Sequence, residues 1–142
     1  MDSELIAKTS VTIHAPVEKV WDALTNPTLI KQYFFGTEAV SDWKVGSPII
    51  FRGAWEGKPY EDRGTILAFE KGKFLKYNYW SSFSGTEDIP ANYANITYSL
   101  ASDKNGTILT ITQDHCKTAE ARDHSEKNWG MVLDGLVKLL GE

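Results

Sequence analysis

The chain has 142 residues, a hydrophobic fraction of 42% and a charged fraction of 24%, which are typical of one globular domain spanning residues 1–142. Its net charge of −4 is spread without runs of like charge, which argues against the basic surface of a nucleic-acid-binding protein. Because no window has the ~18 consecutive apolar residues that cross a bilayer and the single cysteine fits a reducing compartment, we expect a cytoplasmic protein without membrane insertion.

The first part of the chain predicts a strand and then two short helices. Residues 5–14, "LIAKTSVTIH", are rich in β-branched side chains and predict the strand. Pro16 ends it and is expected at the first position of a short helix. The apolar residues of this helix recur over 17–24 with the i, i+3, i+4, i+7 spacing of one helix face. Asn26 is a good N-cap for a second helix that starts at Pro27. That helix carries Leu29, Ile30, Tyr33 and Phe34 on one side.

From residue 37 the apolar pattern changes to the two-residue period of strands. Asn105-Gly106 suits the centre of a type I′ turn, so the last two strands should form an antiparallel hairpin. The segment "SSFSGTEDIPANY" lacks periodicity and predicts a long loop. Strands are expected at residues 37–43, 47–55, 63–70, 73–80, 94–100 and 107–114.

Residues 118–142 predict a long amphipathic helix, because an apolar stripe continues over three turns. Gly130 and Gly135 interrupt this helix, and each costs about 1 kcal/mol relative to alanine. They therefore suggest a close backbone approach or room for another group. The stripe consists of Trp129, Val132, Leu133, Leu136, Val137 and Leu140.

The order of elements and several sequence stretches resemble a known superfamily. "VTIHAPVEKVWDALTNPTLIKQYFFG" is similar to the opening signature of the START-like superfamily, which includes the birch-pollen-allergen proteins. "GTILAFEKGKFLKYNYW" and "EKNWGMVLDGLVKLLGE" resemble its bacterial branch named after the activator of the ninety-kilodalton heat-shock-protein ATPase. The resemblance implies an α+β helix-grip fold: a curved antiparallel sheet of about six to seven strands wrapped on the long C-terminal helix, with two short helices closing one end and a cavity between sheet and helix.

Strand alternation places a set of aromatic and apolar side chains on one face of the expected sheet. Such a lining, with a few hydroxyl and amide tips, has the composition of a small-molecule pocket. The same residues could instead form a solid core whose tyrosine hydroxyls reach its edge. Phe35 falls off the helix stripe and is the aromatic expected to meet a ligand at the mouth or a partner chain. The candidate lining residues are Tyr33, Phe34, Phe35, Phe51, Trp55, Tyr77, Tyr79, Tyr98, Ile111, Gln113, Trp129 and Leu133.

A metal site or a Cys-His nucleophile is not expected. His115 and Cys116 are neighbours, so on a strand they would point to opposite faces, and His124 does not complete a coordination set with them. We therefore expect no metal, no cofactor and no catalytic thiol, and Cys116 is expected to behave as a small hydrophobe.

Charged side chains cluster between Glu56 and Arg63 and could supply an acid–base pair, but a solvated turn explains them more simply. Arg52 is a lone cation among apolar residues. Its side chain could face solvent, or it could project into the cavity and meet an anionic group of a ligand. Because its neighbour Phe51 is assigned to the concave face, strand alternation favours solvent.

The expected function is binding of a hydrophobic or amphipathic small molecule (lipid-like, polyketide-like or aromatic) between sheet and helix, without catalysis. Two alternatives stay open. The resemblance implies a chaperone-associated interaction protein that modulates an ATPase. A cyclase- or hydrolase-like enzyme would use the same cavity and would need a titratable side chain deep inside it. The expected partner is a small hydrophobic ligand, with the chain as monomer or homodimer.

Overall fold

The computed structural model describes residues 5–33, 36–55, 57–80, 87, 89, 92–116 and 118–140. Along the chain the elements are β1 (Leu5–Ile13), α1 (Val17–Thr25), α2 (Pro27–Tyr33), β2 (Glu38–Ser41), β3 (Pro48–Trp55), β4 (Lys58–Glu70), β5 (Phe74–Tyr79), β6 (Ala94–Asp103), β7 (Gly106–Cys116) and α3 (Ala119–Leu139).

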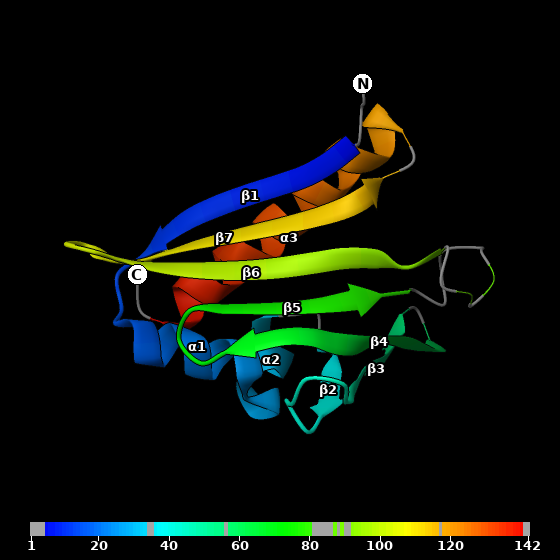
Figure 1. The fold of residues 1–142 in the computed structure, drawn as a ribbon, viewed down its shortest axis with the longest axis horizontal. Coiled ribbons are helices and arrows are strands. Elements are labelled where there is room, and N and C mark those ends of the chain that lie inside the picture. The colour runs from blue at the N-terminus through cyan, green and yellow to red at the C-terminus, as the bar shows by residue number, and fades with distance from the viewer. Residues whose placement is uncertain are drawn as a thin grey trace.

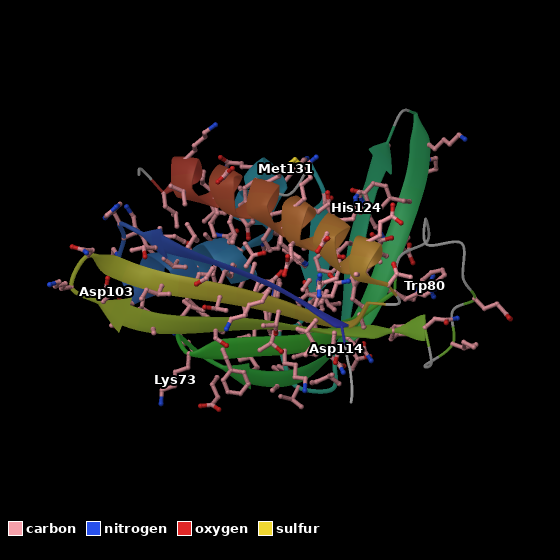
Figure 2. All side chains as sticks on the ribbon, turned by 90° about the horizontal axis from the view of Figure 1, so that it is seen from above. Lys73, Trp80, Asp103, Asp114, His124 and Met131 are labelled. Carbon is pink, nitrogen blue, oxygen red and sulfur yellow. The ribbon has the colours of Figure 1, made fainter. Side chains whose placement is uncertain are left out.

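The strands form one seven-stranded sheet in the order β1-β7-β6-β5-β4-β3-β2 (Figure 1). All neighbouring strands are antiparallel. Helix α3 lies across one face of this sheet, and the β3–β4 hairpin bends out of the plane of the other strands towards the α3 side (Figure 2). The sheet is therefore curved around the C-terminal helix, which confirms the expected α+β helix-grip fold.

The core fills the concave face between the sheet and the three helices. At one end α1 and α2 pack beside the sheet, where the Trp21 ring meets Phe69 edge-on with ring centroids 5.3 Å apart. The Tyr33 hydroxyl donates a hydrogen bond of 2.8 Å to the Ala23 carbonyl, which ties α2 to α1. Helix α3 packs its backbone against β1, β7 and α2. The two short helices thus close one end of the fold, as the resemblance implied.

The helix ends agree with the sequence in part. The Asn26 side chain accepts a 3.0 Å hydrogen bond from the Thr28 amide, so it caps α2 as predicted. Pro16 precedes α1 instead of starting it. The α3 cap is Thr118, whose hydroxyl accepts from the Ala121 amide at 3.0 Å. None of the helices in the described part of the chain has the length and apolar character needed to span a lipid bilayer.

One strand boundary and one turn type were predicted wrongly. Strand β4 begins at Lys58, five residues before the predicted start, because the β3–β4 hairpin pairs Trp55 with Lys58 and closes around a much tighter turn. The β6–β7 hairpin forms as predicted, but Asp103 pairs with Gly106, so the two loop residues are Lys104 and Asn105. Both have negative φ, which excludes a type I′ turn, and the left-handed φ of 135° falls on Gly106.

The two glycines of α3 make a matched pair for a stability test. A Cβ at Gly135 would lie 3.2 Å from the Tyr33 Cβ, whereas a Cβ at Gly130 would meet nothing within 4 Å. Gly130→Ala should therefore raise the free energy of unfolding by up to about 1 kcal/mol through helix propensity. Gly135→Ala should gain less or lose stability because α2 must shift. Urea denaturation of both variants measures the difference, and equal gains would show that Gly135 is not needed for the contact between α2 and α3.

Candidate functional site

Four aromatic rings cross the concave face in a continuous run from β3 to α3. Phe51 contacts Tyr77 with ring centroids 5.8 Å apart, Tyr77 contacts Tyr98 at 5.6 Å, and Tyr98 contacts Trp129 at 6.0 Å. The last two contacts are edge-on, the arrangement that ring quadrupoles favour. This aromatic run (Phe51, Tyr77, Tyr98 and Trp129) therefore connects the β3–β6 part of the sheet to α3 through side chains.

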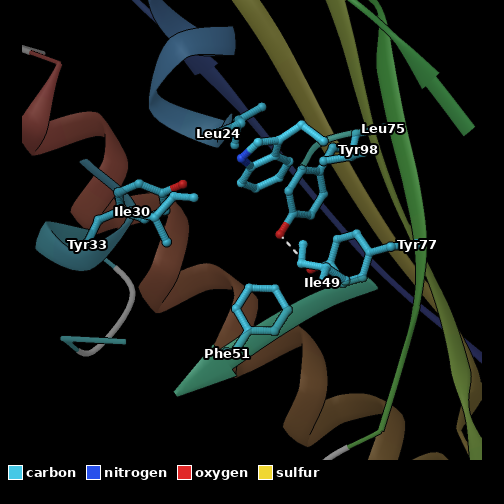
Figure 3. Close-up of a pocket in the computed structure, with 9 residues that line it drawn as sticks. Leu24, Ile30, Tyr33, Ile49, Phe51, Leu75, Tyr77 and Tyr98 are labelled. Carbon is cyan, nitrogen blue, oxygen red and sulfur yellow. Dashed lines mark hydrogen bonds between the residues drawn. The ribbon is translucent and has the colours of Figure 1, made fainter. Parts of the chain in front are cut away.

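The aromatic run borders a small cavity of about 10 Å³ (Figure 3). That volume holds about one water molecule. Among the described residues, ring and aliphatic side chains from the sheet, α1 and α2 fill most of the space around this cavity. The lining consists of Leu24, Ile30, Tyr33, Trp43, Ile49, Phe51, Leu75, Tyr77 and Tyr98.

Tyr77 and Tyr98 place a hydroxyl pair at this cavity. The two oxygens lie 2.8 Å apart and share a hydrogen bond, drawn as a dashed line in Figure 3. Burial raises the pKa of Tyr77 well above its ordinary value, and the nearby Tyr98 raises it further. Burial also raises the pKa of Tyr98, although the hydrogen bond shared with Tyr77 opposes this shift. Both hydroxyls therefore stay protonated at neutral pH, and the cavity carries hydrogen-bonding capacity without charge.

The stability losses from removing the Tyr77 and Tyr98 hydroxyls should not be additive. Tyr77→Phe or Tyr98→Phe leaves the other buried oxygen without this partner, so each should lower the free energy of unfolding by about 1–3 kcal/mol. The double variant should lose less than the sum of the single losses. Guanidinium denaturation of the four proteins measures this coupling. Tyr60→Phe is the control, because its hydroxyl bonds to the Thr37 hydroxyl and its loss should add independently. Additivity for the Tyr77/Tyr98 pair would contradict the prediction.

A second polar pair fixes the α3 end of the aromatic run. The Trp129 indole Nε1 donates a 2.9 Å hydrogen bond to the Gln113 Oε1 on β7. Ile111, two residues earlier on the strand, and Leu133, one turn later on the helix, are buried beside this pair. The orientation of the Trp129 ring is therefore set by the sheet as well as by its own helix.

A third polar pair lies on β4 and β5, and the sequence analysis missed it. Asp62 alternates with Gly64 and Ile66 on the concave side and is only 7% exposed. The Tyr79 hydroxyl donates a 2.6 Å hydrogen bond to its Oδ2 atom. The interpretation of this segment as a solvated turn was wrong for Asp62, because β4 starts earlier than predicted. The inward parity of Asp62 with Ile66 was the signal that could have found it.

The structure brings only part of the predicted lining to the cavity. Tyr33, Phe51, Tyr77 and Tyr98 line it directly. Phe34, Phe35 and the side chain of Trp55 lie outside the described residues, so their predicted roles stay predictions. The remaining candidates belong to the core around the cavity and to the two polar pairs next to it: Tyr79, Ile111, Gln113, Trp129 and Leu133.

The opposite face of the sheet carries a charged surface and a wider hollow. Arg52 is 52% exposed and lies 3.4 Å from the Glu61 carboxylate, which confirms that it faces solvent. Arg63 lies 3.3 Å from the same carboxylate and 5.9 Å from the Trp80 ring centroid. A hollow of about 460 Å³ lies over β3, β4 and β5, lined by Pro48, Ile50, Glu61, Arg63, Gly64, Thr65, Asn78 and Tyr93.

Comparison with known proteins agrees with this architecture. The model of the family described as "Activator of Hsp90 ATPase homolog 1-like protein" matches residues 14–141. The solution structure of ChR145 from Cytophaga hutchinsonii has 48% sequence identity and a TM-score of 0.86, over 99% of this chain and 96% of that one. The crystal structure of MLL2253 from Mesorhizobium loti has 24% identity and a TM-score of 0.77, over 95% and 96%.

A more distant structure shares the fold alone. DynU16, from the dynemicin biosynthetic locus, has 16% identity and a TM-score of 0.81, and the match covers 97% of this chain and 48% of that one. No curated protein matches the chain.

Proposed function

This chain belongs to the family of activator of Hsp90 ATPase homolog 1-like proteins, and we propose that it is a single-domain cytoplasmic protein that binds a hydrophobic or amphipathic small molecule between the sheet and α3. The observation that carries the proposal is the set of three polar pairs within an aromatic interior: Asp62–Tyr79, Tyr77–Tyr98 and Gln113–Trp129. Small-molecule sites combine apolar walls with a few placed polar groups in this way. DynU16, which shares the fold, comes from a biosynthetic locus, where small molecules are substrates or products.

Binding requires the interior to open, because its cavity of about 10 Å³ admits no ligand as it stands. Opening would break side-chain contacts, because the aromatic run joins the β3–β6 part of the sheet to α3 through side chains. The backbone packing of α3 on β1, β7 and α2 would stay in place. Rotating Phe51 or Tyr98 would create space without breaking the sheet. The apparent dissociation constant then equals the intrinsic one divided by the fraction of molecules that are open.

Native mass spectrometry of the protein purified from its own host tests the proposal. We expect a retained small molecule that is lost on denaturation. Added ligand should also shift the NMR signal of the Trp129 indole, which donates to Gln113, more than the signal of Trp21, which packs on Phe69 away from the cavity lining. The proposal would be overturned if the native mass equalled that of the protein alone and a panel of amphiphiles shifted the two indole signals equally or not at all. Co-purification of a chaperone with no small molecule would favour the interaction role instead.

A further inference from the structure

The Tyr77–Tyr98 pair carries one more proton than its hydrogen bond uses. Each phenol has one O–H proton, and the 2.8 Å hydrogen bond between the two oxygens engages one of them. The further contacts of these two side chains are ring contacts along the aromatic run, with Phe51 and Trp129 at its ends. Among the residues that the structure describes, the second phenolic proton therefore has no acceptor.

This second proton is buried at the small cavity. Tyr77 is 1% exposed and Tyr98 is 6% exposed, so bulk solvent does not supply the acceptor. A buried donor that stays unpaired costs about 1–3 kcal/mol. Both side chains line the cavity of about 10 Å³, where their hydroxyls face each other (Figure 3). The cavity is therefore the space from which an acceptor can reach the proton.

The cavity lining determines which kind of acceptor fits. The described lining residues are aliphatic or aromatic, and none of them carries a charge. A carboxylate could accept the proton, but it would be buried there without a cation from the lining, which is costly. An ammonium group has donors only and cannot accept the proton. A neutral oxygen, as in a carbonyl, ether or hydroxyl group, accepts it without burying a charge.

A water molecule and a ligand oxygen offer the same acceptor chemistry. A cavity of about 10 Å³ holds about one water. A ligand that enters when a ring moves would displace such a water, and this weakens binding unless the ligand reproduces the hydrogen bond. A purely apolar ligand leaves the phenolic proton unpaired, whereas a ligand with a neutral oxygen at this point replaces the water fully.

We propose that the bound molecule is an uncharged, mainly apolar compound that places a carbonyl or similar acceptor oxygen at the Tyr77–Tyr98 hydroxyl pair and its apolar part against the aromatic run. This inference rests on the proposed function, since it names the ligand class of the same site. The hydroxyl pair then determines specificity, because it selects a neutral acceptor over a charged group and over a hydrocarbon.

The test compares acetophenone, isopropenylbenzene and benzoate, which share a phenyl ring and a planar substituent of similar size. Acetophenone carries a neutral acceptor oxygen, isopropenylbenzene carries a methylene group in its place, and benzoate carries a charge. NMR titration of the Trp129 indole signal gives the three dissociation constants. The wild-type protein should bind acetophenone at least about tenfold more tightly than either of the other two, as expected for one buried donor that is paired or left unpaired.

Variants of the hydroxyl pair show whether this preference comes from the two phenols. The double variant Tyr77→Phe/Tyr98→Phe should fold, because replacing both partners by apolar groups of the same shape is nearly neutral. It should bind acetophenone and isopropenylbenzene within about twofold of each other. Each single variant keeps one donor and should still prefer acetophenone. Tyr60→Phe is the matched control, because its hydroxyl bonds to Thr37 outside the cavity lining and its loss should leave the preference unchanged.

The outcomes separate this inference from the proposed function. Equal binding of acetophenone and isopropenylbenzene by the wild type would overturn the acceptor assignment alone and would indicate that water is the acceptor. Tightest binding of benzoate, or a wild-type preference in the double variant, would also overturn it. Binding of none of the three would overturn it as well, and together with a native mass equal to that of the protein alone it would overturn the proposed function. The wild-type comparison decides even if the double variant fails to fold.

Discussion

Replacing Phe51 by alanine is expected to lower the free energy of unfolding by about 3–5 kcal/mol and to create a site for a small aromatic molecule. Phe51 is 4% exposed and its ring contacts Tyr77 and Tyr79. Its removal deletes these contacts and leaves apolar space next to the existing cavity of about 10 Å³. The space should persist, because β3 is hydrogen-bonded to β2 on one side and to β4 on the other and cannot move inward.

Thermal unfolding of Phe51→Ala with and without benzene or indole measures both parts of this prediction. A guest that binds only the folded state raises its stability in proportion to the logarithm of the guest concentration. Phe74→Ala is the matched control: this phenylalanine is only half-buried on the opposite face of β5, so it should lose less stability and gain nothing from the guest.

The result bears directly on the ligand proposal. A Phe51→Ala protein that accepts a guest would demonstrate that the interior holds a molecule once one ring moves. A Phe51→Ala protein that loses under about 1 kcal/mol and ignores every guest would contradict the prediction, because it would mean that α3 and the sheet close over the space.

The part of the fold that follows local patterns was predictable from sequence. Asn26 caps α2 as its side-chain chemistry requires, and the apolar stripe of the C-terminal helix buries Trp129 and Leu133. Strand alternation also placed Tyr77 and Tyr98 inward correctly, because both strands are regular and pair with neighbours on both sides. In these cases the periodicity of one element determines its buried face.

The features that could not be predicted depend on pairing between elements or on side-chain volume. Lys58 and Pro59 are poor strand formers, and they join β4 only because β3 supplies partners across the hairpin. With that extension missed, Asp62 was assigned to solvent. The size of the cavity was equally hidden, since alternation gives the direction of a side chain and not whether rings from β3, β5 and β6 fill the space between them.

Gly64→Ala is expected to lower the free energy of unfolding by about 3 kcal/mol, because a methyl group there would overlap the Asn78 carbonyl oxygen of β5. The neighbouring strands approach closely at this point, where the Asn78 side chain replaces a backbone partner and accepts a 2.6 Å hydrogen bond from the Thr65 amide. Backbone pairing resumes between Arg63 and Trp80. An added methyl must push β4 and β5 apart, and no rotation of a side chain relieves it.

Urea denaturation gives the loss of stability, and amide hydrogen exchange at Thr65 and Trp80 locates it, because both amides donate across the β4–β5 seam. Gly53→Ala on β3 is the matched control. Its Cβ would meet the Tyr60 hydroxyl at 2.6 Å, the far end of a side chain that can move, so its loss should be smaller. Wild-type stability and exchange in Gly64→Ala would mean that β4 and β5 do not approach this closely. The expected loss of stability would show that β4 and β5 can approach this closely only with glycine at position 64. Gly64, Thr65 and Asn78 also line the hollow on the outer face, so this close approach lies at the hollow.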